Sequence, residues 1–249
     1  MRTIQKHPTP NALTQWREPR LAANRAEGME CTYDELRRTS EALEAVEYHL
    51  FAEQGGICAY TEHRLGLTLT SPASQREVNF HLEHLIPQTY CAYGQDTDYA
   101  NLVACWPRPN CGFEPAYGAR KKGSWPSTTE LSKFVSPLRE DCSARFKFDH
   151  RGNINETQGD DEAAKETITK LGLNHHTLTE LRRAAIRGAL NPGSRRIKLA
   201  EAHKLLQKLR QDSDSVDQGN SIQLMPFCSA IESALAREIR KLEAIRKQK

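Results

Sequence analysis

Apolar residues recur at helical spacing in several segments of this chain, and polar capping residues mark where these segments begin. The first expected helix follows a Thr-Tyr-Asp-Glu capping box at residues 32–35 and ends at the glycine pair 55–56. Its apolar positions are Leu36, Leu43, Val46 and Leu50. The preceding residues contain Pro8, Pro10 and Pro19, which predict an irregular arm rather than a helix.

Helical periodicity returns after residue 126. A Ser-Thr-Thr-Glu box at 127–130 predicts a short helix, and a Thr-Leu-Thr-Glu box at 177–180 predicts a longer one that continues through Ile186. We expect a further helix over residues 195–209. The polar and acidic residues 211–220 predict a flexible connection.

A terminal helix is expected to open at the Ser-Ala-Ile-Glu sequence 229–232, and it carries a narrow apolar stripe. The stripe comprises Ile231, Leu235, Ile239 and Leu242. Such a helix either packs on its own domain or docks into a groove of a partner protein. The expected flexible connection would let it reach outward, so both alternatives stay open at this point.

Strand signals are fewer. Residues 145–149 alternate between apolar and polar side chains before a turn at 151–153, which predicts a strand. Short apolar runs in residues 57–126 predict a small hairpin and one helix joined by long loops. The whole pattern predicts a helix-rich α+β fold. We divide it into an N-terminal arm and helix (1–56), a central region (57–126) and a helical C-terminal region (127–249).

Composition places the chain among folded proteins. Its 249 residues can bury a sizeable core, and 38% apolar with 27% charged residues is typical of ordered chains. No apolar run approaches the roughly 18 residues that span a bilayer, and the first residues have no apolar signal core. We therefore expect a cytoplasmic protein with no membrane partner.

Cysteine number and charge distribution narrow the function further. Seven cysteines, an odd number, in a chain without an evident secretion signal argue against a disulfide framework. The net charge is only +3, but residues 181–249 hold 15 Lys and Arg against 7 Asp and Glu. This basic region predicts contacts with nucleic-acid phosphates, although solvated helix faces explain any single residue equally well.

The strongest chemical signal is the pair Glu83-His84, which Asn101 follows after a loop. Hydrolysis of a phosphodiester needs a base that deprotonates water and a cation that neutralises the growing charge. Imidazole has a pKa of about 6.5, so His84 suits the base, and Glu83 is a hard oxygen ligand for Mg2+ or Mn2+. Adjacent strand residues point to opposite faces, so both reach one substrate only if the strand twists or bulges.

Further polar residues complete this candidate site. Asn101 can fix either the ring of His84 or the backbone of the facing loop. Lys121 and Lys122 follow downstream, where a lysine can meet the scissile or a neighbouring phosphate, and we assign Lys121 to the site. A His beside a Glu is, taken alone, more often structural than catalytic, so the prediction depends on the order and spacing of the whole set.

The flanking cysteines suggest a structural zinc. A zinc knuckle takes four ligands, usually as two Cys-x-x-Cys pairs. Here Thr61 stands where the first pair needs its second cysteine, and five residues separate Cys105 from Cys111. Zinc would bind through Cys58, Cys105, Cys111 and one of His63, His81 or Cys91. The alternative is that these cysteines pack as small apolar residues.

These residues resemble the core of HNH endonucleases, which has the ββα-metal fold. The resemblance rests on Cys58-Ala59-Tyr60, Glu83-His84-x-x-Pro87, Gly94, Asn101-Leu102, Cys105, Cys111 and Lys121-Lys122-Gly123. An N-terminal pattern from Met1 to Leu13 and a later one from Phe148 to Arg182 are also similar to the PtuB family, the HNH subunits of Septu anti-phage systems. Together these patterns span most of the chain.

The resemblance implies cleavage of phage or host nucleic acid, with DNA expected in preference to RNA. It also implies a partner, a PtuA-like ATPase, and in some systems a retron reverse transcriptase with its DNA. His84 would be the general base, Glu83 a metal ligand and Asn101 the middle Asn of the motif. The third metal-site residue would lie near Cys111, where we prefer Asn110 to Glu114.

A binding module is the rival interpretation. A non-catalytic zinc-knuckle adaptor would position nucleic acid or an ATPase without cutting. Such an adaptor has no need of an imidazole base, so replacement of His84 separates the two functions.

Overall fold

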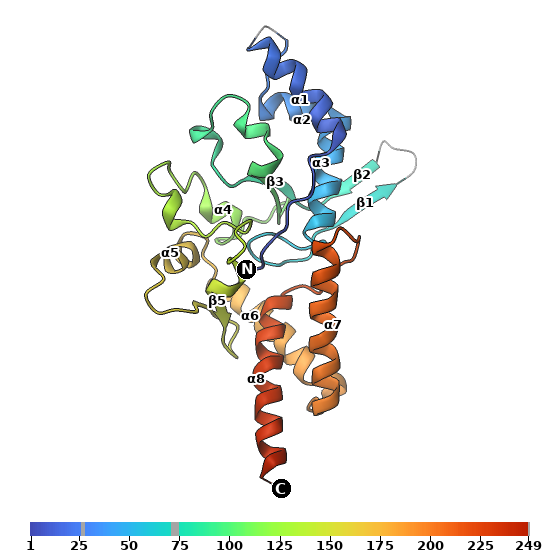
Figure 1. Cartoon of the computed structure of the whole chain (residues 1–249), viewed down its shortest axis with the longest axis vertical. Helices are drawn as coiled ribbons and strands as arrows, with labels where there is room; N and C mark the ends of the chain where they lie inside the picture. Colours follow the sequence, from blue (N-terminus) through green and yellow to red (C-terminus); the bar gives the residue numbers. More distant parts are fainter. Residues whose placement is uncertain (26–27, 71–74, 249) are drawn as a thin grey trace.

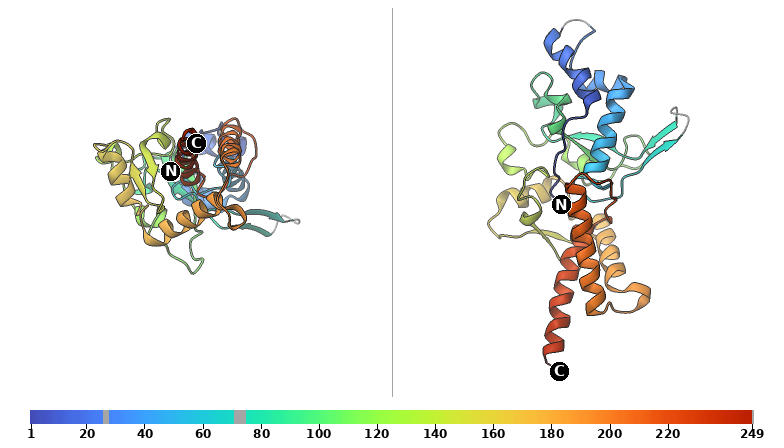
Figure 2. Two further views of the ribbon diagram at one scale, coloured as in Figure 1. Left: turned by 90° about the horizontal axis from the view of Figure 1, so that it is seen from below. Right: turned by 45° about the vertical axis from the view of Figure 1, so that its right-hand side comes forward.

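Helices occupy both ends of the molecule in the computed structural model, which describes residues 1–25, 28–70 and 75–248. Three lie at one end (Figure 1), namely α1 (Asn11–Ala23), α2 (Tyr33–Arg38) and α3 (Ser40–Glu53). Three more form a bundle at the other end, namely α6 (His176–Leu190), α7 (Leu199–Asp217) and α8 (Cys228–Lys247). The right-hand view of Figure 2 also shows how α8 extends away from the rest of the chain.

Short antiparallel strand pairs lie between these helical ends. Within the described residues they form three two-stranded sheets. The pairs are β1 (Leu67–Thr70) with β2 (Gln75–Val78), β3 (His81–His84) with β4 (Leu102–Cys105), and β5 (Phe146–Phe148) with β6 (Ile154–Glu156). Two short helices accompany them, α4 (Ala119–Lys122) and α5 (Glu162–Lys170). The predicted helix-rich α+β class is therefore confirmed, and so is the strand predicted within residues 145–149.

The turn between β5 and β6 shows why its glycine is needed. Gly152 has a φ of +86°, and a Cβ placed on it would lie 2.3 Å from the backbone oxygen of Thr179 in α6. Arg182 of α6 also donates to the Gly152 carbonyl, at 3.3 Å. The close backbone approach thus fixes the hairpin against α6.

The N-terminal helices follow their capping signals only in part. Thr32 caps α2 as expected, because its Oγ1 accepts a hydrogen bond from the Glu35 amide at 3.4 Å. The expected single helix is, however, two helices with a bend at Thr39 (φ −103°, ψ 97°). Trp16 of α1 donates from Nε1 to the Thr39 side chain at 3.0 Å and holds this bend against α1.

The prediction of an irregular N-terminal arm was wrong for residues 11–23. They form α1 even though Pro19 lies inside it. Leu13 and Trp16 are buried on one face of this helix, and their burial against α3 outweighs the proline penalty. Tertiary packing therefore makes residues 11–23 helical, and the helix propensity of these residues does not indicate this packing.

Two predictions in the C-terminal region need correction. The box at 127–130 opens only one 3-10 turn, Leu131–Lys133, although the Glu130 carboxylate accepts hydrogen bonds from the amide (3.1 Å) and the hydroxyl (2.6 Å) of Ser127 as a capping box does. Residues 211–220 are not a flexible connection, since α7 continues to Asp217. Arg2 pairs with Asp217, and Val216 is fully buried, so the N-terminal segment and the core stabilise this last part of the helix.

The terminal helix α8 belongs to the protein's own core. Ile231, Leu235 and Ile239 of its apolar stripe are buried, while Leu242 is half-buried. The helix packs against α7, α6 and β5. Of the two alternatives for this stripe, the structure thus shows packing on its own domain, and the buried face is not open to a partner.

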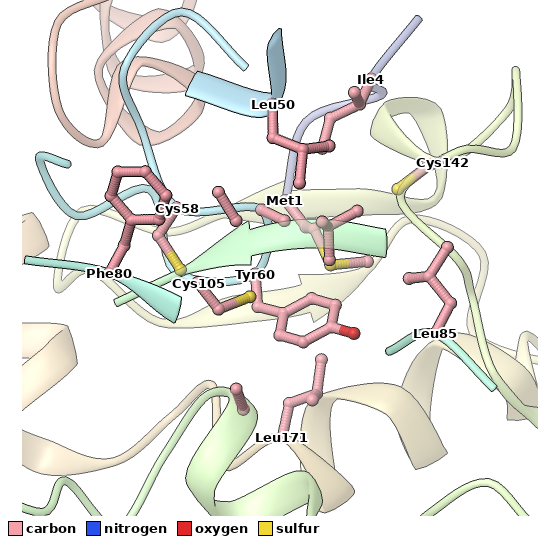
Figure 3. Packing of buried hydrophobic residues seen from close by; sticks show 14 of the residues in the cluster. Met1, Ile4, Leu50, Cys58, Tyr60, Phe80, Leu85, Cys105, Cys142 and Leu171 are labelled. Atoms are coloured by element: carbon pink, nitrogen blue, oxygen red, sulfur yellow. The ribbon is translucent and has the colours of Figure 1, made fainter. Parts of the chain in front are cut away.

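One hydrophobic cluster joins all three segments into which the sequence was divided. Figure 3 shows part of it, where Met1 and Ile4 lie close to Leu50, and the sulfurs of Cys58 and Cys105 lie near the ring of Tyr60. A second cluster fills the space between α7 and α8. The β3–β4 pair therefore sits on a well-packed base, which fixes the position of the candidate site.

Candidate functional site

The ladder between β3 and β4 is regular to its end. His81 pairs with Cys105, and His84 pairs with Leu102, with no bulge between them. Burial alternates along β3, so His84 lies on the buried face and Glu83 on the partly exposed one. The bulge considered from the sequence is absent from this ladder. The two side chains can therefore meet one substrate only at the end of the strand, where His84 is the last residue.

His84 is held as a neutral base by the loop between β3 and β4. Its Nε2 lies 2.8 Å from the carbonyl oxygen of Asp96. Because a carbonyl oxygen only accepts, Nε2 carries the proton and Nδ1 keeps its lone pair. The ring of Tyr33 lies edge-on against that of His84, at 4.6 Å. Burial lowers the pKa of His84, although the hydrogen bond to Asp96 and the charge of Glu83 oppose this, so the ring is neutral at pH 7.

Glu83 is held as an anion by a lysine from α4. Nζ of Lys122 lies 2.8 Å from Glu83 Oε1 and also 2.8 Å from the carbonyl oxygen of His84. Lys122 is only 3% exposed, so the ammonium group is buried between the strand and the helix. Burial would raise the pKa of Glu83, but His81 and Lys122 together lower it. The second oxygen, Oε2, remains available to a cation.

Asn101 fixes the loop rather than the ring of His84. Its Oδ1 accepts from the Ile86 amide at 2.7 Å, and its Nδ2 donates to the Ile86 carbonyl at 3.1 Å and to the Gln95 carbonyl at 3.3 Å. The sequence left open whether Asn101 fixes the ring of His84 or the backbone of the facing loop. In the structure it fixes the backbone of the loop. Since Gln95 directly precedes Asp96, Asn101 also helps to position the Asp96 carbonyl, which orients the ring of His84.

The structure brings Lys122, and not Lys121, to Glu83. Lys121 is exposed, and its side chain lies beside Gly172. Asn110 is exposed with a φ of 60° and lines the same groove as His81. Glu114, the other candidate for the third metal residue, is paired with Arg120 at 2.8 Å on the surface.

The cysteines expected to bind zinc do not come together. Cys58 and Cys105 are buried as neighbours, whereas Cys111 is exposed and directs its thiol to the Phe113 carbonyl. Across residues 1–25, 28–70 and 75–248, no group of three or more His, Cys, Asp or Glu is placed to hold a metal ion. A tetrahedral structural zinc needs four ligands, so these residues do not fit it.

Hydrogen bonds within the chain surround the Cys58 thiol. The Trp106 amide donates to Cys58 Sγ at 3.4 Å. Burial would raise the pKa of Cys58, but hydrogen bonds from Cys105, Thr61 and this amide outweigh burial and lower it to about 6. Burial, together with its bond to Cys58, raises the pKa of Cys105. Thr61, which replaces the second cysteine of a zinc knuckle, thus supports the Cys58 sulfur.

We predict that Cys105 contributes to stability by packing and that Cys111 does not. Cys105→Ala should lower the free energy of unfolding by about 1–2 kcal/mol, whereas exposed Cys111→Ser should change it by less than about 0.5 kcal/mol. Urea unfolding of both variants measures this. Equal destabilisation by both, with zinc released from the wild type by a chelator, would show instead that the cysteines share a metal.

A groove of about 590 Å3 lies beside β3. It is lined by Tyr33, Arg37, Leu43, Glu47, Val78, Phe80, His81, Leu82, Arg108, Pro109 and Asn110. Arg37 and Arg108 are exposed, and within the described part of the chain no ion pair links either to a carboxylate. Burial raises the pKa of Glu47 to about 7, partly offset by Arg108, so this carboxyl carries only part of its charge at neutral pH. The groove therefore favours an anionic ligand.

Some basic side chains of the C-terminal third pair with carboxylates within the chain. The pairs include Arg195 with Glu201, Arg196 with Glu238, Lys208 with Asp212 and Arg210 with Glu232. Paired helix faces account for these four residues, while phosphate contacts by the other basic side chains of this region stay a prediction.

Sequence reasoning considered His81 only as a possible zinc ligand, not as a neighbour of Glu83, and it missed the groove arginines. His81 precedes Glu83 by two positions, and a period of two places both on one face of a strand, so a signal existed. The groove itself forms between α2, α3 and the segment after β4, and no local pattern indicates it.

Comparison of the sequence with models of known protein families gives no match, and comparison with curated proteins gives none either. Among the helices in the described ranges, none has both the length and the apolar character required to cross a membrane.

Proposed function

We propose that this chain is a metal-dependent HNH-type endonuclease that hydrolyses phosphodiester bonds of nucleic acid at the end of β3. The hydrogen bond between His84 Nε2 and the Asp96 carbonyl carries this proposal, because it leaves Nδ1 as a proton acceptor, and the adjacent residue on β3 is the ionised Glu83. A neutral imidazole beside a carboxylate with one free oxygen suits base-catalysed, cation-assisted hydrolysis. The order β3, β4, α4 supports a ββα-metal core.

Each residue has a separate task in this mechanism. His84 Nδ1 accepts the proton of the attacking water, and the Asp96 carbonyl then stabilises the imidazolium through Nε2. Asn101 holds the loop that carries this carbonyl. Lys122 keeps Glu83 ionised. A Mg2+ or Mn2+ ion bound by Glu83 would neutralise charge on the phosphate and the leaving oxygen.

The groove beside β3 supplies a path for the nucleic-acid strand. Arg37 from α2 and Arg108 after β4 would contact phosphates on either side of the scissile one, because both guanidinium groups line the groove. Tyr33 lines the same groove and its ring contacts that of His84, so the groove that would hold the strand lies next to the proposed base. DNA is the proposed substrate in preference to RNA.

In its finer form, the proposal makes the chain the effector subunit of a cytoplasmic anti-phage complex. Its partner would be a PtuA-like ATPase and, in some systems, a retron reverse transcriptase with its DNA. The similarity to the PtuB pattern supports this part, which co-purification of the proteins encoded beside this chain would test.

Cleavage of DNA by the purified full-length chain tests the proposal directly. We expect nicking or cutting with Mg2+ or Mn2+, and none with EDTA, because the leaving oxygen then has no cation. Gel assays on duplex DNA, single-stranded DNA and RNA measure this. Tight binding of nucleic acid without cleavage under either ion would favour the non-catalytic adaptor instead.

The groove arginines are expected to bind phosphates. Arg37→Ala and Arg108→Ala should each weaken DNA binding and reduce the slope of log K against log salt by about 1, since one phosphate contact is lost. Fluorescence anisotropy at several salt concentrations measures this. Arg38→Ala is the matched control, because the neighbouring Arg38 pairs with Glu35 on α2. An equal loss in all three variants would mean that the effect is general charge and not the groove.

A further inference from the structure

His81 and Glu83 project from the same face of β3, two residues apart. Both side chains are partly exposed, at 18% and 15%. Their facing atoms, His81 Nε2 and Glu83 Oε2, are 3.7 Å apart, which is too long for a hydrogen bond. The other oxygen of Glu83 is already paired with Lys122, so Oε2 is the atom left for a further partner.

The protonation of His81 is set by the backbone. Its Nδ1 lies 2.7 Å from the carbonyl oxygen of Pro107, which can only accept, so Nδ1 carries the proton and Nε2 of the neutral ring has a lone pair. A histidine whose second ring nitrogen donates to a backbone carbonyl is the usual arrangement of a metal-binding imidazole. When the ring is neutral, Nε2 and Oε2 therefore present two lone pairs to the same space, whereas the protonated ring pairs with Glu83 and lowers its pKa.

We propose that His81 Nε2 and Glu83 Oε2 together bind one divalent transition-metal ion. Bonds of about 2.0–2.2 Å to nitrogen and oxygen, at angles between 90° and 120°, place two ligands about 3–3.7 Å apart. The measured separation of 3.7 Å lies at the upper end of this span. An imidazole ligand favours Mn2+ or a later transition metal over Mg2+, which prefers oxygen alone.

Two protein ligands leave the rest of the coordination sphere to water and phosphate oxygens. The Lys122 ammonium beside Glu83 also opposes a second cation, so the ion binds weakly without nucleic acid. The chemical purpose of this ion rests on the proposed nuclease function, but its binding can be measured without any cleavage. The competing arrangement is an ion pair between protonated His81 and Glu83, which would bind no metal.

Mn2+ binding by the full-length chain, measured from the electron paramagnetic resonance signal of free Mn2+, tests this proposal. We expect His81→Ala and Glu83→Gln each to lose about tenfold or more in affinity. His203→Ala is the matched control, because His203 faces Glu243 at 3.3 Å on the surface of α7 and α8. Binding by the wild type no tighter than by His81→Ala overturns the proposal.

A second measurement needs no variant at His81. In the folded wild type, Mn2+ should broaden the imidazole NMR signal of His81 before that of His203, and Mg2+ added at the same concentration should not reverse this. Equal broadening of both signals overturns the site. Mn2+ binding with no cleavage by the wild type would leave the metal site standing and refute the nuclease, whereas cleavage without binding at His81 would do the opposite.

Discussion

Replacing His84 by alanine is expected to lower the rate of DNA cleavage by about 10²–10⁴-fold, the usual effect of losing a general base. The reason is geometric. Nε2 is committed to the Asp96 carbonyl, so Nδ1 is the ring atom that can take a proton from water. Affinity for DNA should change little, because the proposed phosphate contacts come from Arg37 and Arg108 in the groove.

Single-turnover cleavage at saturating enzyme measures this loss free of binding effects. His84→Gln is a second variant, since an amide can still donate to the Asp96 carbonyl while it cannot serve as the base. His203→Ala controls for removal of a histidine elsewhere. Cleavage by His84→Ala at the wild-type rate, in preparations free of other nucleases, would refute the assigned role and favour the adaptor.

Local sequence patterns predicted the elements whose structure depends on contacts between residues close in the sequence. Thr32 caps α2 as expected, and the apolar stripe at Ile231, Leu235 and Ile239 is a buried helix face. Local signals failed where distant segments meet. Residues 211–217 are polar, but Arg2 pairs with Asp217 across almost the whole chain and helps extend α7. No propensity within those residues could have shown that contact.

The candidate site divides in the same way. Glu83 and His84 were found from their order and spacing, and the structure places Asn101 on the loop that orients His84. Which of Lys121 and Lys122 contacts Glu83 depends on the face that α4 turns towards β3. The sequence does not show this, because the two residues are identical and adjacent. The expected zinc trio failed because Cys111 lies in an exposed segment that does not fold back onto Cys58.

Lys122→Met is expected to lower the free energy of unfolding by about 3–5 kcal/mol, because it leaves the carboxylate of Glu83 without its buried partner. The loss is a large part of the roughly 5–15 kcal/mol that stabilises a typical domain. Urea unfolding followed by circular dichroism measures it. The same change at the exposed neighbour, Lys121→Met, is the control and should cost less than about 0.5 kcal/mol.

A double variant separates the charge from the packing. Glu83→Gln added to Lys122→Met removes the uncompensated anion, so it should recover more than half of the lost stability, and the two changes should not be additive. Additive losses would show that Lys122 acts through its buried alkyl chain and its bond to the His84 carbonyl rather than through Glu83. In that case Glu83 would hold its charge without help from α4, and both of its oxygens would be available to a cation.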